Sequence, residues 1–158
     1  NRLASNSLLE GLVFGARIAE DIAKNLSTWE DPISPDPIEI LISPSVRGEL
    51  QRSMSKGAAV VRSEKSLKET LTTLERLKDA TTIYANLDAW ETTNLYLLAT
   101  AITRSALERT ESRGSHWRED YPTPIDNWQK RIHQSIDEIG NWRSSHEEVF
   151  DDLSIMRK

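Results

Sequence analysis

Three prolines within one short segment constrain the fold of this 158-residue chain more than any other feature. They lie in Asp31–Pro37, and Pro44 follows a few residues later. Proline lacks the amide hydrogen that a helix interior needs and holds the preceding residue in an extended conformation, so no helix should run through this segment. The sequence therefore predicts a terminal segment and helix over residues 1–26, a proline-rich linker over 27–43 and a helical domain over 44–158.

The stretch from Ser7 to Leu26 predicts a helix whose apolar residues cover more than one face. Ser7 and Glu10 have the spacing of a capping box, in which both side chains satisfy amide groups at a helix N-terminus. Because the apolar surface exceeds one face, we expect this helix to pack on several sides, against a missing partner or a second copy of the chain.

Three later stretches have apolar residues at helical spacing, which predicts an antiparallel three-helix bundle. The first, over about 44–56, has Ser43 as its N-cap and Pro44 at its first position. The second, over about 64–79, is capped by Ser63 or Ser66. The third, over about 88–112, should be the central helix and should stop at Gly114. Its predicted apolar stripe contains Leu95, Leu98, Ala99, Ile102, Ala106 and Arg109.

Beyond Pro122 and Pro124 the helical period fails and apolar residues alternate with polar ones. This alternation predicts a short β-hairpin over about 128–147. The predicted fold class is therefore mainly α: an N-terminal helix, an antiparallel three-helix bundle and a short C-terminal β-hairpin.

Composition excludes several classes of function. The formal net charge of −5 disfavours nucleic acid as a partner, and no apolar run reaches the length of a membrane-spanning helix. The chain has no cysteine, and its three histidines lack the spacing of a zinc site, so no metal is expected. Its glycines form no phosphate-binding loop, and no nucleophile elbow is present.

Two segments concentrate chemically useful residues. In the first, Arg2 precedes the start of the first predicted helix, where free amide groups and a guanidinium could bind an anion. The alternative is an ordinary capped helix with a surface arginine. In the second, residues 111–122 combine acids, bases and aromatic rings after a helix end, which suits an interdomain polar network or a ligand edge. The alternative is an ordinary helix C-terminus with basic residues near the negative end of the dipole. Spacing alone does not decide between these interpretations.

Both segments also resemble a known family. The run NRLASNSLLEGLVFG at 1–15 resembles the flavin-contacting motif of the succinate dehydrogenase/fumarate reductase flavoprotein superfamily, and Ala4, Ser5 and Glu10 resemble its L-aspartate oxidase branch most. The runs ESRG at 111–114 and REDYP at 118–122, with His116, resemble the signature of the superfamily's C-terminal helical domain. Residues between 50 and 62 also fit, and all of these matches follow the family's order.

The resemblance implies that the chain is the C-terminal portion of an FAD-dependent enzyme that oxidises L-aspartate to iminoaspartate at the start of NAD synthesis, with oxygen or fumarate as acceptor. Arg2 would bind a substrate carboxylate, and the backbone of Ser7 and Leu8 would meet the flavin. A spectrin-like helical bundle would brace the flavin domain, with Arg113, His116 and Arg118 as the contact edge.

The resemblance implies further expectations about location and partners. The dinucleotide-binding loop and the other catalytic residues would lie upstream, so we expect the chain alone to be inactive and to bind no FAD. The parent would be cytoplasmic, and quinolinate synthase, the next enzyme of the pathway, is a candidate partner.

Two alternatives stay open. The chain could be the C-terminal part of a flavoprotein subunit of succinate dehydrogenase or fumarate reductase, although that branch usually has glycine and aspartate where this chain has Ala4 and Glu10. It could also be a free-standing helical interaction module whose likeness to the superfamily is structural only.

Overall fold

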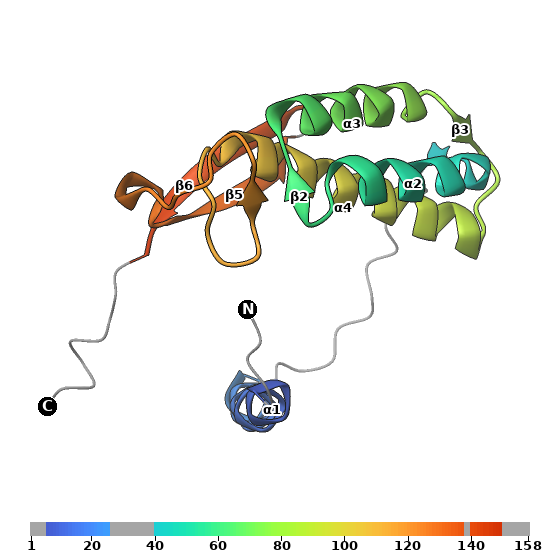
Figure 1. Ribbon diagram of the computed structural model, residues 1–158. Helices are drawn as coiled ribbons and strands as arrows, with labels where there is room; N and C mark the ends of the chain where they lie inside the picture. The colour runs from blue at the N-terminus through green and yellow to red at the C-terminus, as the bar shows by residue number, and fades with distance from the viewer. Residues whose placement is uncertain (1–5, 26–39, 138–139, 150–158) are drawn as a thin grey trace, which may run out of the picture. The chain divides into compact units, whose positions relative to one another are not determined.

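The computed structural model describes residues 6–25, 40–137 and 140–149. Two compact units make up the chain, Asn1–Ile38 and Glu39–Lys158. In the first unit the described element is α1 (Asn6–Asn25), shown in blue in Figure 1. The helix begins at Asn6, so Ser7 lies inside its first turn, and the expectation that Ser7 caps it is wrong.

The second unit is built on three helices that pack side by side, α2 (Arg47–Gly57), α3 (Glu64–Leu77) and α4 (Leu87–Glu108) (Figure 1). The short 3-10 helix η1 (Pro44–Val46) leads into α2, and Ser43 accepts a hydrogen bond from the Ser45 amide at its start, as the sequence predicts. Ser63 and Ser66 form a reciprocal capping box at the start of α3. The expected mainly α fold with a bundle of three helices is confirmed.

Small strands tie the ends of the bundle together. β1 (Leu41–Ile42) pairs antiparallel with β3 (Thr81–Thr82), so the segment entering the bundle meets the loop between α3 and α4. β2 (Val61–Arg62) pairs in parallel with β4 (Trp117–Arg118). The sequence pattern does not predict these strands, because two residues are too few to show a period.

The predicted hairpin is present with slightly later bounds. After the 3-10 helix η2 (Asp126–Trp128), β5 (Lys130–Ile136) pairs antiparallel with β6 (Trp142–Glu148), with Lys130 opposite Glu148 and Ile136 opposite Trp142. Gly140 has a φ of 83° next to the turn, a conformation that favours glycine.

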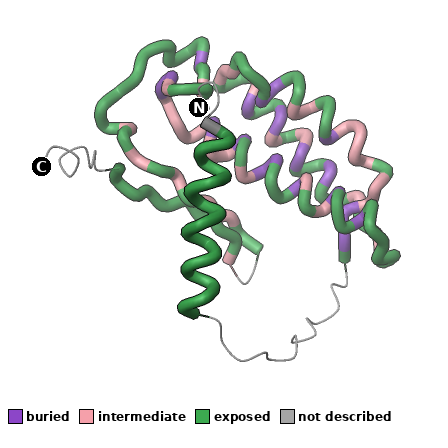
Figure 2. The backbone as a smooth tube through the Cα atoms, turned by 90° about the horizontal axis from the view of Figure 1, so that it is seen from below, coloured by how far each residue is buried: buried purple, intermediate pink, exposed green. Residues whose placement is uncertain are grey.

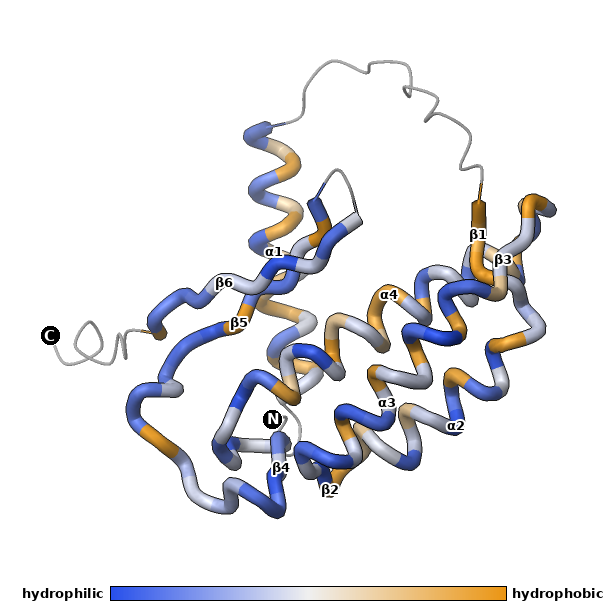
Figure 3. The backbone as a smooth tube through the Cα atoms, turned by 90° about the horizontal axis from the view of Figure 1, so that it is seen from above, coloured by the Kyte–Doolittle hydropathy of each residue, from blue (hydrophilic) through white to orange (hydrophobic). Residues whose placement is uncertain are grey.

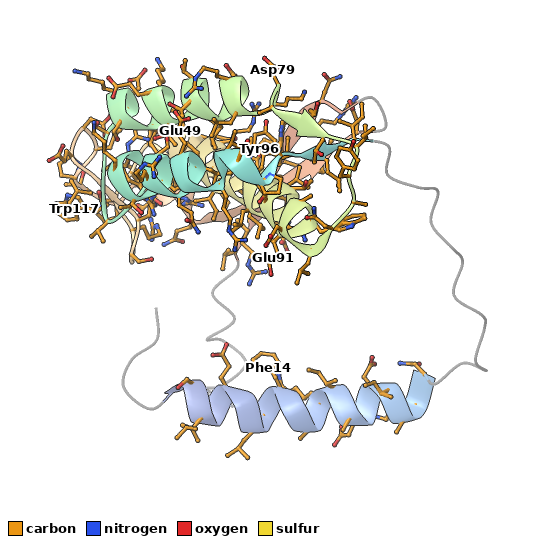
Figure 4. All side chains as sticks on the ribbon, turned by 90° about the vertical axis from the view of Figure 1, so that its right-hand side faces the viewer. Phe14, Glu49, Asp79, Glu91, Tyr96 and Trp117 are labelled. Carbon is orange, nitrogen blue, oxygen red and sulfur yellow. The ribbon has the colours of Figure 1, made fainter. Side chains whose placement is uncertain are left out.

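The bundle's core consists of two apolar clusters. The larger contains Ile42, Leu50, Leu74, Leu77, Tyr96 and Ala99. The smaller contains Ala58, Leu67 and Ala106, and the partly buried Met54 packs against both. Figure 2 shows the buried residues along the three helices, and Figure 4 places Tyr96 among the packed side chains of the bundle.

The face that α4 turns to the core differs from the predicted stripe. Leu98 is 60% exposed and Ile102 is 48% exposed, whereas Ala99 and Ala106 are buried as expected. The other buried positions are small or hydroxylated residues, Ala89, Thr92, Thr100 and Thr103, together with Tyr96. Small side chains let α2 and α3 approach closely, and Thr92, Thr100 and Thr103 each donate a hydrogen bond to the carbonyl four residues earlier, so their burial leaves no unpaired hydroxyl.

One close approach requires glycine. A Cβ on Gly57, the last residue of α2, would lie 2.1 Å from Thr70 Oγ1 and 2.8 Å from the Ser66 carbonyl oxygen of α3. The absence of a side chain therefore lets the end of α2 touch α3 directly.

Candidate functional site

The predicted site residues fall in two separate places. Arg2 lies outside the described residues. Ser7 and Leu8 lie in the first turn of α1, and both are exposed. Arg113, His116 and Arg118 lie together in the segment that follows α4, where they belong to one polar network with Arg62, Arg109, Glu111 and Asp120.

The network starts where α4 ends. The helix stops at Glu108, four residues earlier than predicted, because Arg109 takes an extended conformation with φ −75° and ψ 102°. Gly114 does not end the helix; it has a φ of 60° in a tight turn in which Arg113 and His116 exchange backbone hydrogen bonds. This early exit from the helix lets residues 109–120 fold back over its C-terminus.

Glu111 is the centre of this segment, with a side chain that is 0% exposed. Its carboxylate accepts hydrogen bonds from Arg109 Nη1 at 2.8 Å, from Arg113 Nε at 2.7 Å and Nη2 at 3.0 Å, and from the Ile125 amide at 2.8 Å. Burial alone would raise the pKa of Glu111, but these donors outweigh it and lower the pKa to about 2. Glu111 is therefore a buried carboxylate that stays charged.

Arg118 connects the end of α4 to the start of α3. Its guanidinium is 1% exposed and binds Asp120 through two parallel hydrogen bonds of 2.8 Å. Its Nη1 donates to the carbonyls of Ala106 and Leu107, which the helix leaves without amide partners. Asp120 also accepts a hydrogen bond from the Glu64 amide at the N-terminus of α3, and its pKa is lowered, chiefly by Arg118.

His116 is held as a neutral ring. Arg62 Nη1 lies 2.8 Å from His116 Nδ1, and because a guanidinium only donates, Nδ1 must accept. Nε2 then carries the proton and donates to the Arg109 carbonyl at 3.2 Å. Burial lowers the pKa of His116, and the charges of Arg62, Arg118 and Arg109 lower it further.

The hairpin is fastened to the same end of α4. Arg109 donates to the carbonyls of Trp128 and Lys130, and Glu108 accepts hydrogen bonds from Ser144 and His146, both at 2.6 Å. These contacts connect residues far apart in sequence, so no local pattern could identify them. The sequence did contain a sign that Glu111 could pair with arginines, because Arg109 and Arg113 stand two residues before and after it.

The arrangement joins structural elements and does not resemble a reaction centre. Within the described residues no group of three or more histidine and carboxylate side chains could hold a metal ion. In the same part of the chain, no helix is long and apolar enough to cross a membrane. A partner could reach only the outer edge of the network, where the Arg113 side chain is 37% exposed and His116 is half-buried.

Comparison with known proteins places this bundle in a family. The sequence profile of the family described as "Fumarate reductase flavoprotein C-term" matches residues 47–152. Curated relatives include L-aspartate oxidase from Streptomyces coelicolor, 37% identical over 84% of this chain, and L-aspartate oxidase from Mycobacterium tuberculosis, 37% identical over 79% of it. A third, a subunit of the CoM/CoB fumarate reductase from Methanothermobacter marburgensis, is 34% identical over 84% of the chain.

The chain spans about a quarter of the length of these relatives, between 24% and 28%. Among solved structures, the FrdA subunit of E. coli quinol fumarate reductase matches 94% of the chain and 26% of that subunit, with a TM-score of 0.57 and 21% identity, and therefore shows the fold. A Mycobacterium smegmatis Sdh1 complex matches 85% of the chain and 24% of the solved chain, with a TM-score of 0.53 and 26% identity. The family match covers the three-helix bundle and the polar segment that follows it. The chain therefore belongs to the fumarate reductase flavoprotein C-terminal family.

Proposed function

We propose that this chain is the C-terminal part of an FAD-dependent L-aspartate oxidase, which converts L-aspartate to iminoaspartate at the first step of NAD synthesis and passes the electrons to oxygen or fumarate. The observation that carries the proposal is the 37% identity to L-aspartate oxidases of several bacteria over about four fifths of the chain. Cytoplasmic location, L-aspartate as substrate and quinolinate synthase as a partner follow from this proposal.

In this proposal the N-terminal segment serves the reaction. The guanidinium of Arg2 binds one carboxylate of the substrate, and the backbone of Ser7 and Leu8 meets the edge of the flavin. FAD, when bound, would be the acceptor of the substrate's hydride. The first turn of α1 contains no acidic residue, so the positive end of the helix dipole is not neutralised there and fits a ring that gains negative charge.

The exposure of α1 supports a role inside a larger domain. Leu8, Leu12 and Ile18 are each more than half exposed, and Figure 3 shows apolar and polar residues alternating around the helix. Burying such side chains would stabilise an assembly by roughly 1.5–3 kcal/mol each. We propose that the remainder of the flavin domain covers them, with residues 1–26 belonging to that domain, 27–43 acting as the linker and 44–158 forming the helical domain.

The helical domain braces the flavin domain through the edge formed by Arg113 and His116. Arg118 is fully buried and therefore acts as a positioning residue, which holds that edge by fixing Asp120 and the end of α4. An open cavity of about 520 Å³ beside this edge is lined by His116, Arg62 and the exposed Ile102 of α4. This mixture of apolar and cationic groups suits an interface with another domain.

A second candidate is a flavoprotein subunit of fumarate reductase or succinate dehydrogenase, which the 34% identity to the CoM/CoB fumarate reductase of Methanothermobacter marburgensis favours. Turnover of the complete parent enzyme separates the two. We expect L-aspartate to give hydrogen peroxide and reduction of an acceptor dye, and succinate to give neither. Succinate turnover without aspartate turnover would establish the second candidate, and the 158-residue chain alone should be inactive with both.

Replacement of Arg2 tests the substrate role. Arg2→Leu in the parent should lower kcat/KM for L-aspartate by about 100-fold or more, because a charge-assisted bidentate contact is lost, with FAD still bound. Arg17→Leu, which removes an arginine within α1, is the control and should keep full activity. Equal activity of the Arg2 and Arg17 variants would contradict the assignment.

Replacement of Ile102 tests the bracing role. Arg113→Ala should loosen FAD in the parent, but it also removes two hydrogen bonds from buried Glu111 and so weakens the bundle itself. Ile102→Gln changes an exposed side chain, so the melting temperature of the 158-residue chain should stay within about 2 °C. The same change should weaken FAD retention in the parent. Unchanged FAD content in both variants would rule out the bracing role.

A further inference from the structure

A cavity of about 350 Å³ lies where the segment after α4 meets η2 and the start of β5. Its wall includes Arg109, Arg113, His116, Trp128 and Lys130. The volume is at the lower end of the range for small-molecule sites, about 300–1,000 Å³. It is therefore large enough for a compact metabolite.

The residues that line this cavity include cations but no carboxylate. Three cations line it, Arg109, Arg113 and Lys130. Glu111 is the carboxylate paired with Arg109 and Arg113; it lies buried and binds both arginines. Asp126 is a second carboxylate near Arg113, close enough to raise the pKa of Arg113 after the larger effect of its hydrogen bond to Glu111. Glu148 lies opposite Lys130 in the hairpin, but no carboxylate lines the cavity, so the lining itself is cationic and would attract anions.

Two of the cations have donors to spare. Arg113 uses Nε and Nη2 for Glu111 and for the Ile125 carbonyl, which leaves Nη1 without a partner among the described residues. In that same part of the chain, no carboxylate lies within ion-pair distance of the Lys130 ammonium, which rests 5.2 Å from the centre of the Trp128 ring. Unpaired donors of this kind are what an oxyanion requires.

The aromatic wall is fixed before any ligand binds. Trp128 Nε1 donates to Thr110 Oγ1 at 3.0 Å, and the Trp128 carbonyl accepts from Arg109 Nη1 at 2.8 Å. The Arg109 guanidinium lies 5.3 Å from the same ring centre, so cation–π contacts hold both neighbouring charges. A site whose groups are already ordered loses little entropy on binding.

We propose that this cavity binds a compact oxyanion with two negative charges, carrying phosphate or carboxylate groups, through Arg113 Nη1 and the Lys130 ammonium, with Trp128 as the wall. The site shares Arg113 and His116 with the edge that we propose to contact the flavin domain, so in the parent its ligand would bind beside that contact. Binding to the 158-residue chain does not depend on the role proposed for Arg2. Its ligand would act on the bundle end of the enzyme as an effector and not as a substrate.

Titration of the 158-residue chain with inorganic phosphate and with malonate tests the proposal. Calorimetry at constant ionic strength, balanced with chloride, should show one saturable site with a Kd of about 1 mM for at least one probe. The indole N–H resonance of Trp128 should shift along the same curve. Binding of phosphate alone points to a phosphate ester as ligand, binding of malonate alone to a dicarboxylate, and binding of both to the shared oxyanion chemistry.

Lys130→Gln and Arg131→Gln form the matched pair. Both remove one positive charge from neighbouring positions of β5, but Arg131 does not line the cavity and instead faces Glu147 at 3.7 Å. Lys130→Gln should weaken binding by about tenfold or more and Arg131→Gln by less than about twofold. No saturation below about 10 mM, or equal weakening by the two variants, would overturn the proposal.

Discussion

The helices α1 and α4 have almost equal lengths but differ in how far their side chains are buried. α1 has 20 residues and all of its described side chains are exposed, whereas α4 has 22 residues and buries seven. Both helices contain large apolar side chains, yet the residues that α4 buries are alanine, threonine and tyrosine; Figure 2 shows the burial and Figure 3 the hydropathy along the chain. Apolar content thus shows that a helix needs a partner, but burial depends on whether the partner is present and how closely it can approach.

The ends of the two helices differ as well. The C-terminal carbonyls of α4 are bound by Arg118, and the chain that follows is fixed by buried Glu111. For α1 the last turn contains Lys24, and Asn25 donates to Asp21 at the surface. The polar network, and not apolar burial alone, therefore makes α4 part of a fixed unit. Hydrogen exchange resolved by region can follow the two helices separately in the same chain.

The largest effect should come from breaking the network at Glu111. Glu111→Gln removes the buried negative charge and leaves Arg109 and Arg113 without it, which should lower the free energy of unfolding by about 3–5 kcal/mol in urea titrations. Exchange of α4 amides should accelerate, while exchange of α1 amides stays the same. Glu119→Gln, at an exposed position in the same segment, is the control and should change the free energy by less than about 0.5 kcal/mol. A small effect of both variants would show that the network does not stabilise the unit.

One substitution made in both helices tests the comparison directly. Ala99 of α4 is 4% exposed in the core, and Ala16 of α1 is exposed. Ala99→Leu should lower the free energy of unfolding by about 2–3 kcal/mol because the added atoms have no space. Ala16→Leu should leave it within about 0.5 kcal/mol. Similar losses from the two variants would mean that α1 is packed as α4 is.

A pair of glycines in α2 measures how closely the bundle is packed. Gly57→Ala places a Cβ against Thr70 and the Ser66 carbonyl, so stability should fall by about 1–2 kcal/mol. At Gly48 the nearest atom to a new Cβ is the flexible end of Arg52, 3.2 Å away, so Gly48→Ala should be neutral or should stabilise the helix by up to about 1 kcal/mol. Thermal unfolding of the two variants gives the difference, and a destabilised Gly48→Ala would count against the steric argument.

The smallest predicted effect is on pH dependence. The pKa of His116 is lower in the folded chain than its ordinary value of 6.5, so the unfolded chain binds the proton more readily. The stability that neutral His116 contributes is complete above about pH 6.5 and is lost as the pH falls toward the folded pKa. His116→Gln should flatten the stability curve between about pH 7 and 5, which urea titrations at a series of pH values would measure. An unchanged slope in His116→Gln would contradict the neutral ring.

Much of this architecture could be predicted from local sequence. The caps at Ser43 and Ser63 and the alternation beyond Pro124 depend on backbone chemistry within a few residues, and the bundle and the hairpin follow them. The predicted linker over 27–43 lies mostly outside the described residues and stays a prediction. The face of α4 could not be predicted in this way. Hydropathy favours Leu98 and Ile102 for burial, but close approach of neighbouring helices selects alanine and threonine instead.

The candidate site likewise has residues that the sequence could identify and contacts that it could not. The sequence alone brought Arg113, His116 and Arg118 to notice, since they stand together in one dense segment, and its resemblance to the flavoprotein superfamily is borne out by the family match. Only the tertiary structure showed that Glu111 is their buried counter-charge, that Asp120 joins Arg118 to α3, and that Lys130 faces a cavity with Trp128. Local patterns determine helices, turns and caps because those depend on neighbouring residues. Partners such as Arg62 and His116, 54 positions apart, meet only after the chain folds.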